Sequence, residues 1–409
     1  MKFIRNLNSL LLKKDFFSYL QTISLPLPII LIECMEVLIK EVTTKKELMR
    51  FVKFNHELYK DSPYHVPGLI AEELMTLSKD KNPAFEIADA IYYIAYRGDK
   101  IVGRIAGIIN HRNNETYNTK NARFGFVDFI DDAEVVDRLF DAVERWAKDK
   151  GMEAIHGPLG FTDLDHEGML IEGFDRLGTM AALYNFDYYP PHMERMGYMK
   201  DLDWMEFIIT LPDEVPEKHT RIGELVKEKY GLKTIKFKKR KEIWPYAQRI
   251  FDTLNKSYAH LYGYTELTPK QIDYYVKMYI PMLRLDLITV IVREEDDAVV
   301  GFGITLPSLS RALQKAKGRM LPFGFIYLLK ALYSKPKIVD FYLLGVLPEY
   351  KNKGVNALVF TDLIPIYKKI GAVYAESNPE LETNNAIQAQ WSYFDIEHHK
   401  KRRAFFKKL

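Results

Sequence analysis

Hydrophobic and polar positions along this chain follow two periods, and together they predict one series of elements twice. In the second half, two apolar runs flank the acidic turn Glu294–Asp297, a pattern typical of a β-hairpin. Further apolar runs and 3.6-residue periods predict a strand, a helix that stops at Gly371, a second strand and a second helix. The predicted ranges are 287–293 with 299–307, 339–344, 357–371, 372–376 and 377–391.

The first half repeats this order with weaker motifs. Its predicted ranges are a strand at 37–42, a helix at 44–59, a hairpin of 91–96 with 100–109, a strand at 123–129 and a helix at 133–150. Helices are also expected at 216–230, 244–264 and 269–285. The repeat is one of architecture and is not visible as sequence identity.

The loop between the strand at 339–344 and the helix at 357–371 carries the most informative chemistry. It is short, basic and glycine-containing, with Lys351, Gly354 and Asn356 before Ala357. Free backbone N–H groups and the positive end of a helix make such a loop an anion cradle. An ordinary strand–turn–helix connection is the alternative interpretation.

This loop resembles the acyl-CoA pyrophosphate loop of the GCN5-related N-acetyltransferase (GNAT) superfamily, Arg/Gln-x-x-Gly-x-Gly/Ala. Lys351 stands at the first position and Gly354 at the fourth, while Asn356 replaces the last small residue. The resemblance covers roughly 232–409. It implies an α/β fold with a mixed sheet, built as two tandem acyl-CoA N-acyltransferase folds. The expected domains are 35–212, with a degenerate cofactor loop, and 213–409, with the acyl-donor loop.

The first half is expected to hold no nucleotide. Asp131 and Asp132 precede its helix at 133–150. Carboxylates at a helix N-terminus occupy the place of a pyrophosphate and repel it.

The resemblance also implies which residues contact the donor. Acyl-CoA or acyl carrier protein is expected as co-substrate, with no permanently bound cofactor. The amide of Val346 or Leu347 is expected to donate to the oxyanion of the thioester carbonyl. The full donor-binding set is Val346, Leu347, Lys351, Lys353, Gly354, Val355, Asn356, Ala357 and Asn385.

N-acyl transfer requires an uncharged amine, so a general base is needed. In this family the base often lies on the strand before the cofactor loop or on the strand after its helix. Glu376 fits the second position, and Glu349 is nearer the loop. Tyr393 is expected to protonate the leaving thiolate. A solvated acid is the alternative for Glu376, and other tyrosines compete with Tyr393.

A long acidic, aromatic and glycine-rich segment, 158–194, is expected to bind the amine acceptor. The alternative is a solvated loop. The predicted acceptor-binding residues are Asp163, Asp165, His166, Glu167 and Tyr262.

An apolar insertion at 307–333 lies where small acetyltransferases usually have a turn. It could wall an acyl-chain tunnel, touch a membrane face, or pack the two halves together. The chain as a whole resembles bacterial tandem members of the superfamily, some of which act in lipid pathways, including ceramide formation. That resemblance implies a long acyl group and a lipid-like amine.

Composition narrows the remaining options. The net charge is +3, which is no general nucleic-acid signature, and the basic clusters at 236–241 and 398–403 are expected to be solvated faces. The single cysteine, Cys34, excludes a disulfide framework, and no metal site is predicted. Residues 1–34 are expected to be a doubtful leader, which favours a cytoplasmic protein that is at most peripheral to a membrane.

The leading hypothesis is therefore an N-acyltransferase that moves an acyl group to a primary amine. Two alternatives stay open. One is an aminoacyl-tRNA-dependent transferase of tandem GNAT fold, and the other is a non-catalytic acyl-CoA sensor or scaffold.

Overall fold

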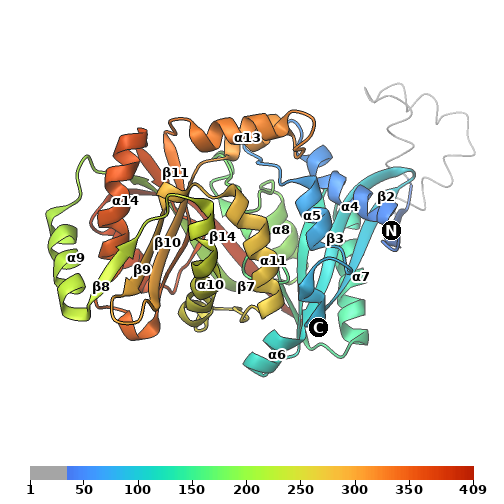
Figure 1. Ribbon diagram of the computed structural model, residues 1–409. Helices are drawn as coiled ribbons and strands as arrows, with labels where there is room; N and C mark the ends of the chain where they lie inside the picture. Colours follow the sequence, from blue (N-terminus) through green and yellow to red (C-terminus); the bar gives the residue numbers. More distant parts are fainter. Residues whose placement is uncertain (1–34) are drawn as a thin grey trace, which may run out of the picture.

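The computed structural model describes residues 35–409, apart from the side chain of Ala386. The predicted leader, 1–34, lies outside the described residues. Figure 1 shows two halves side by side around one continuous twisted sheet.

The two halves repeat one order of elements, as the hydrophobic pattern predicts. The first half contains β1 (Val37–Glu41), α4 (Lys45–Leu58), α5 (Ile70–Thr76), β2 (Ala88–Arg97), β3 (Lys100–Asn110), α6 (His111–Tyr117), β4 (Asn121–Phe129), α7 (Ala133–Asp149), β5 (Ala154–Gly157), β6 (Met169–Glu172), α8 (Tyr189–Arg195) and β7 (Met199–Thr210). The second contains α9 (Glu217–Tyr230), β8 (Leu232–Ile235), α10 (Trp244–Tyr258), α11 (Pro269–Tyr279), β9 (Ile288–Arg293), β10 (Val299–Pro307), α12 (Ser310–Ala316), α13 (Gly324–Tyr333), β11 (Ile338–Val346), α14 (Ala357–Ile370), β12 (Tyr374–Glu376), β13 (Glu380–Leu381), α15 (Asn385–Trp391) and β14 (Asp395–Lys408).

The sheet runs β1-β2-β3-β4-β5-β14-β7-β12-β11-β10-β9-β8, with β6 beside β14 and β13 beside β7. Most neighbours are antiparallel, while β4 with β5 and β11 with β12 are parallel. Helices cover both faces: in the second half α14 and α9 pack on one face, and α10 and α11 on the other. The predicted mixed α/β fold in two tandem copies is confirmed.

The two halves exchange their last strands. β7 pairs with β12 and β13 of the second half, whereas β14 pairs with β5 and β6 of the first half. The exchanged strands also pair with each other along their length, from Asp395↔Thr210 to Phe406↔Met199. The domain boundary near residue 212 stays a prediction. Each half completes its sheet with a strand from the other half.

Buried ion pairs tie the exchanged strands together. Lys400 of β14 lies 2.8 Å from Glu206 of β7 and 2.7 Å from Glu376 of β12, and Arg402 also pairs with Glu206. Burial raises the pKa of Glu206, but Arg402 and Lys400 outweigh it and bring the pKa to about 2. The expectation of a solvated basic face at 398–403 is wrong for Lys400 and Arg402, because alternation along β14 turns both side chains into the core.

A fork opens in the sheet of the second half. β11 and β12 pair only from Ile338↔Tyr374 to Asp340↔Glu376, and β11 continues to Val346 without that neighbour. A β-bulge at Tyr342 bends β11 here, because Ile304 pairs with Leu343 and the next residue with Phe341. The fork leaves backbone groups of β11 open to a ligand.

Glu206→Gln is expected to destabilise the chain strongly, because Lys400 and Arg402 would lose a buried counter-ion. Breaking a buried pair costs about 3–5 kcal/mol. The measurement is the free energy of unfolding by chemical denaturation. The matched control is Glu397→Gln, since Glu397 of β14 pairs with Arg176 at 2.6 Å at an exposed site, where about 0–1 kcal/mol is expected. Equal effects of the two variants would show that the buried network does not hold the strands.

Candidate active site

The fork between β11 and β12 forms a continuous cleft that leads from the basic loop into the centre of the molecule. Two adjoining pockets make it up, and both are lined by Tyr258, Leu344 and Asn384. The outer pocket reaches Lys351 and Asn356 of the loop. The inner pocket reaches side chains of the first half.

The loop has the backbone that an anion cradle requires. Gly354 has a φ of +79°, in the left-handed region that favours glycine. Within residues 35–409, the amides of Gly354, Val355 and Asn356 donate no hydrogen bond, and no side chain caps α14. A Cβ on Gly354 would meet Ile222 of α9 at 2.6 Å, so the glycine is also needed for packing.

Two basic side chains face each other at the mouth of the outer pocket. The Nζ of Lys351 lies 2.8 Å from the Nε2 of His260, and both residues line the pocket. Burial lowers the pKa of His260, and the neighbouring Lys351 lowers it further. The ammonium of Lys351 can donate to the neutral imidazole of His260, and its other N–H bonds remain available to a phosphate beside the loop.

Along the open edge of β11, a backbone carbonyl and a backbone amide point to the same side. The hydroxyl of Tyr258 donates to the carbonyl of Leu344 at 3.0 Å, which marks the open side of the strand. Backbone groups of a strand alternate between its two edges, so the amide of Val346 faces the same side. The amide of Leu347 instead donates to the carbonyl of Val300 at 2.9 Å. Leu347 is therefore removed as an oxyanion donor.

In the first half the corresponding fork is filled by the chain itself. The amide of Leu159 donates to the carbonyl of Phe124 at 2.9 Å, and a Cβ on Gly125 would lie 2.2 Å from the carbonyl oxygen of Leu159. At the start of α7, the carboxylate of Asp132 accepts from the amide of Glu134 and pairs with Arg97 at 2.6 Å. Both features support the expectation that this half binds no nucleotide.

The segment 158–194 brings partly buried acids to the inner end of the cleft. Asp163 and Glu167 line both the inner pocket and a larger cavity between the halves. Burial raises the pKa of Asp163 to about 7, although Arg123 opposes the shift. Burial and the neighbouring Asp163 raise the pKa of Glu167. The carboxyl group of Asp163 can therefore exchange protons at neutral pH.

Hydrogen bonds to the backbone hold the side chains of Asp165 and His166. Asp165 accepts from the amides of Phe161 and Thr162 at 2.8 and 3.0 Å, and His166 bonds the carbonyl of Met180 at 2.9 Å. Both side chains line the same inter-half cavity. Asp165 and His166 are therefore partly buried and held by backbone hydrogen bonds at the wall of the cavity.

The cavity between the halves combines these acids with apolar walls. Its apolar lining comes from both halves and includes Val66, Leu69, Leu164, Met180, Met278, Met282 and Leu313. At the acidic wall, Arg104 pairs with both Glu73 and Asp128, and one guanidinium balances only one of these two carboxylates. The cavity thus suits a molecule with an amine at one end and an apolar body.

A separate apolar pocket opens from the bulge of β11. It lies between α10 and α11, is lined by residues such as Ala247 and Phe302, and reaches Tyr342 and Leu343 at the fork. The insertion lies elsewhere: Leu328 of α13 packs on α12, in a cluster with Leu313. An acyl tunnel walled by α13, one of the predicted options, is therefore not what the structure shows.

Not all of the other residues predicted to bind the donor line the cleft. Asn384 lines the cleft, whereas its neighbour Asn385 is exposed and lines neither pocket. Val355 and Ala357 are core residues of the loop. The ammonium of Lys353 lies over the ring of Tyr230, 5.3 Å from its centre, and outside the lining of the cleft.

The two predicted catalytic residues do not line the cleft. Glu376 is buried at the base of the fork and is already paired with Lys400. Tyr393 is about half exposed, and its hydroxyl accepts from Lys218 at 2.8 Å. The tyrosine at the centre of the cleft is Tyr258, which lines both of its pockets and the inter-half cavity.

Sequence reasoning missed Tyr258, His260 and Asn378. The amide side chain of Asn378 bridges the fork by donating to the carbonyl of Tyr342 at 2.7 Å. Tyr262, which was predicted, lines the inner pocket and bonds His156 at 2.9 Å and also Asp201. The sequence predicts a helix over 244–264, whereas α10 ends at Tyr258, so both Tyr258 and His260 were expected inside a helix.

Among the described residues, Glu206, Glu376 and His399 lie close enough together to hold a cation. The ammonium of Lys400 already bonds both carboxylates, so a protein cation takes that position. Over residues 35–409, no helix is long and apolar enough to cross a bilayer.

Comparisons with known proteins agree with this geometry. No family model matches the chain. Protein YghO of Escherichia coli (strain K12) is 27% identical over 380 residues, which cover 91% of this chain and 95% of that protein. The bacterial ceramide synthase of Caulobacter vibrioides (strain NA1000 / CB15N) is 27% identical over 316 residues, 76% of this chain and 80% of that protein.

Among solved structures, a tandem GNAT protein from the clavulanic acid biosynthesis pathway matches with a TM-score of 0.52 at 12% identity, covering 91% of this chain and 98% of its own. A GCN5-related glucosamine N-acetyltransferase region of a fungal multi-domain protein gives a TM-score of 0.52 at 12% identity, over 91% of this chain and 38% of that one. These matches show the tandem GNAT fold.

Lys351→Ala is expected to weaken CoA binding by roughly ten- to a hundredfold, the range for losing one charged hydrogen bond to a phosphate. The matched control is Lys353→Ala, two residues away, whose ammonium rests on Tyr230. Isothermal titration calorimetry with CoA measures both. A larger loss for Lys353→Ala would place the pyrophosphate outside the predicted cradle.

Proposed function

We propose that this chain, with its tandem GNAT fold, is an N-acyltransferase that moves an acyl group from acyl-CoA or acyl carrier protein to a lipid-like primary amine. The observation that carries the proposal is one continuous path. It starts at the cradle of Gly354 and Lys351, follows the open edge of β11, and ends at the partly buried acids Asp163 and Glu167.

The donor side is supported by the second half alone. The pyrophosphate would sit on the free amides before α14, beside Lys351 and His260. The pantetheine arm would follow β11 in the place of a missing strand, with Val346 as a backbone partner. A thioester at the bulge would then face Tyr258.

The acceptor side is supported by the cavity between the halves. A protonated amine is attracted to its acids, while an apolar body packs against methionine and leucine side chains. The relative named bacterial ceramide synthase supports a lipid-like acceptor.

In the proposed reaction, the carboxylate of Asp163 takes a proton from the amine. The amine nitrogen then attacks the thioester carbon, and the oxyanion accepts a hydrogen bond from the amide of Val346. The C–S bond breaks as the amide forms, and the hydroxyl of Tyr258 gives its proton to the leaving thiolate. The second proton, which the attacking nitrogen loses as it becomes an amide, then restores the hydroxyl of Tyr258. Burial raises the pKa of Tyr258 to about 12, so the hydroxyl is protonated at neutral pH.

Asp163→Asn is expected to lower kcat by about a hundredfold or more while leaving the Kd for CoA unchanged. Because only the ionised base can act and burial raises its pKa to about 7, wild-type kcat/KM should rise with pH through neutrality and level off above it. The asparagine variant should lose this rise.

Glu376→Gln is the matched comparison, since Glu376 remains the alternative base. With its fold verified by circular dichroism, this variant should keep its pH profile. Loss of the profile in Glu376→Gln with normal turnover in Asp163→Asn would move the base to Glu376. CoA binding without any acyl transfer to amines would instead favour the sensor hypothesis.

Ala247→Trp is expected to shorten the preferred acyl chain, because it fills the apolar pocket that opens at the bulge. Each buried methylene contributes about 0.8 kcal/mol, so the loss of two methylene sites lowers the ratio of kcat/KM for palmitoyl over acetyl donors by roughly tenfold. Phe325→Asp on α13 should leave the ratio unchanged. If only the α13 variant lowers the ratio, the insertion houses the chain.

A further inference from the structure

The insertion presents an apolar surface to solvent. Leu328 and Leu332 of α13 face inward, but the preceding turn and the outer side of the helix are exposed. The exposed fractions are 76% for Leu321, 66% for Phe323 and 51% for Leu329. We call Leu321, Phe323, Ile326, Leu329 and Tyr333 the α13 surface. A contiguous set of large exposed apolar residues is unusual on a soluble protein and marks an interaction site.

The charge around the α13 surface is of one sign. From Ser308 to Val339 the chain carries seven basic residues and no acidic residue. They are Arg311, Lys315, Lys317, Arg319, Lys330, Lys335 and Lys337. In the part of the chain that the structure describes, no acidic residue forms a salt bridge with any of them, unlike the paired basic residues of β14.

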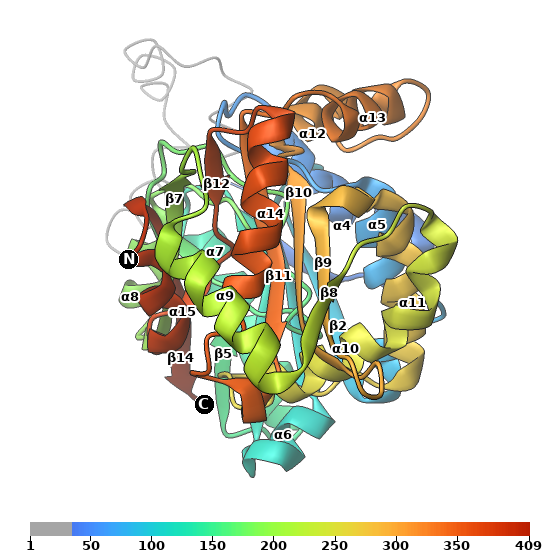
Figure 2. The same ribbon diagram turned by 60° about the vertical axis from the view of Figure 1, so that its left-hand side comes forward.

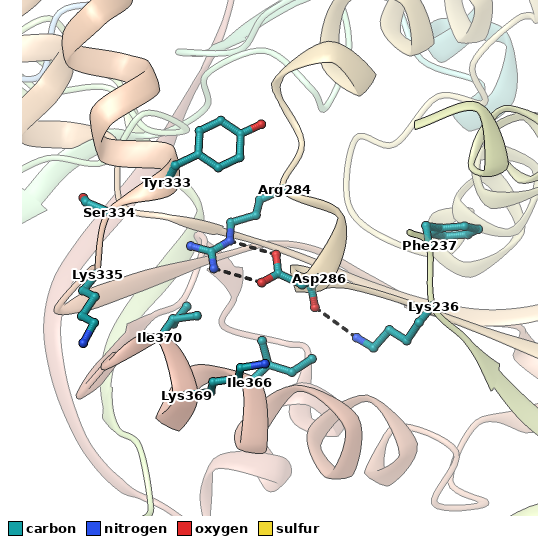
Figure 3. Close-up of a pocket in the computed structure, with 10 residues that line it drawn as sticks. All are labelled: Lys236, Phe237, Arg284, Asp286, Tyr333, Ser334, Lys335, Ile366, Lys369 and Ile370. Carbon is teal, nitrogen blue, oxygen red and sulfur yellow. Dashed lines mark hydrogen bonds and ion pairs between the residues drawn. The ribbon is translucent and has the colours of Figure 1, made fainter. Parts of the chain in front are cut away.

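A basic pocket continues the surface beyond the C-terminal end of α13. Figure 3 shows it between Tyr333 and the end of α14. Arg284 is neutralised by Asp286 in this pocket, and Lys236 by Asp362. Lys335 and Lys369, from the two sides of the pocket, form no salt bridge within residues 35–409. Two free ammonium groups beside an exposed apolar helix suit anionic headgroups.

The surface lies over the inter-half cavity. Figures 1 and 2 show α12 and α13 standing out from one end of the molecule. α12 spans both halves: Gln314 donates to the carbonyls of Pro63 and His65, while Leu313 lines the cavity. A partner on the α13 surface is thus separated from the cavity by one helix.

We propose that the α13 surface binds the face of an anionic lipid bilayer, with the apolar side chains inserted at the headgroup boundary and the basic residues on the lipid phosphates. Apolar insertion next to unpaired basic residues is the combination that holds interfacial helices on anionic membranes. The proposal does not depend on the proposed acyl transfer, since binding is measured without catalysis.

The test is flotation of the full chain with vesicles of phosphatidylcholine, with and without phosphatidylglycerol. Binding is expected to the anionic vesicles, and to weaken with salt. The double variant Leu321→Asp, Phe323→Asp should reduce the bound fraction by about tenfold or more, as should Lys335→Glu with Lys369→Glu. Unchanged melting temperatures establish that the variants fold.

The matched control is Leu225→Asp. The side chain of Leu225 is 57% exposed on α9, on another face of the molecule, so this variant should bind vesicles as the wild type does. Unchanged flotation of the Leu321→Asp, Phe323→Asp variant would overturn the proposal and leave residues 1–34 or another face as the anchor. Equal binding to neutral vesicles would also overturn it. The proposal would also be overturned if the same lysines bound an acidic acyl carrier protein and the chain did not bind vesicles.

Discussion

The exchange of the last two strands is the constraint on which the rest of the structure depends. β14 completes the sheet of the first half, and β7 that of the second, so neither half has a complete sheet alone. Lys400 and Arg402 meet Glu206 between these strands, in an interior where an unpaired charge is costly. The ion pairs therefore fix the register of the exchange more than they add to net stability. That register sets the distance between the fork of one half and the loops of the other.

The site follows from this arrangement. The second half supplies the open edge of β11 and the cradle before α14. The first half supplies acids from a segment that also blocks its own fork, since Leu159 occupies the place beside Phe124. Residues of the first half thus line the cleft of the second half. The segment that fills the fork of the first half also carries Asp163 to the cleft of the second half.

The sequence predicted local features well, because local physics determines them. The hairpin of β9 and β10, the stop of α14 at Gly371 and the acidic cap at Asp132 were all readable from nearby residues. The exchange was not readable, because it depends on which distant edges pair. For that reason Lys400 and Arg402 were taken as solvated, although they are buried. The role of Tyr258 was not readable either, because only the fold brings the end of α10 to the open edge of β11.

The strand order also bears on how the chain is made. β14 follows every other strand in the sequence, so it leaves the ribosome after all of them. Until it arrives, β5 and β7 expose unpaired edges, and such edges invite pairing with other chains. The basic stretch of β14 keeps this segment hydrated before it pairs. Its residues are Lys400, Lys401, Arg402 and Arg403. Its pairing then joins both halves in one step, so a nascent chain passes from two separate sheets to one continuous sheet only once β14 has been made.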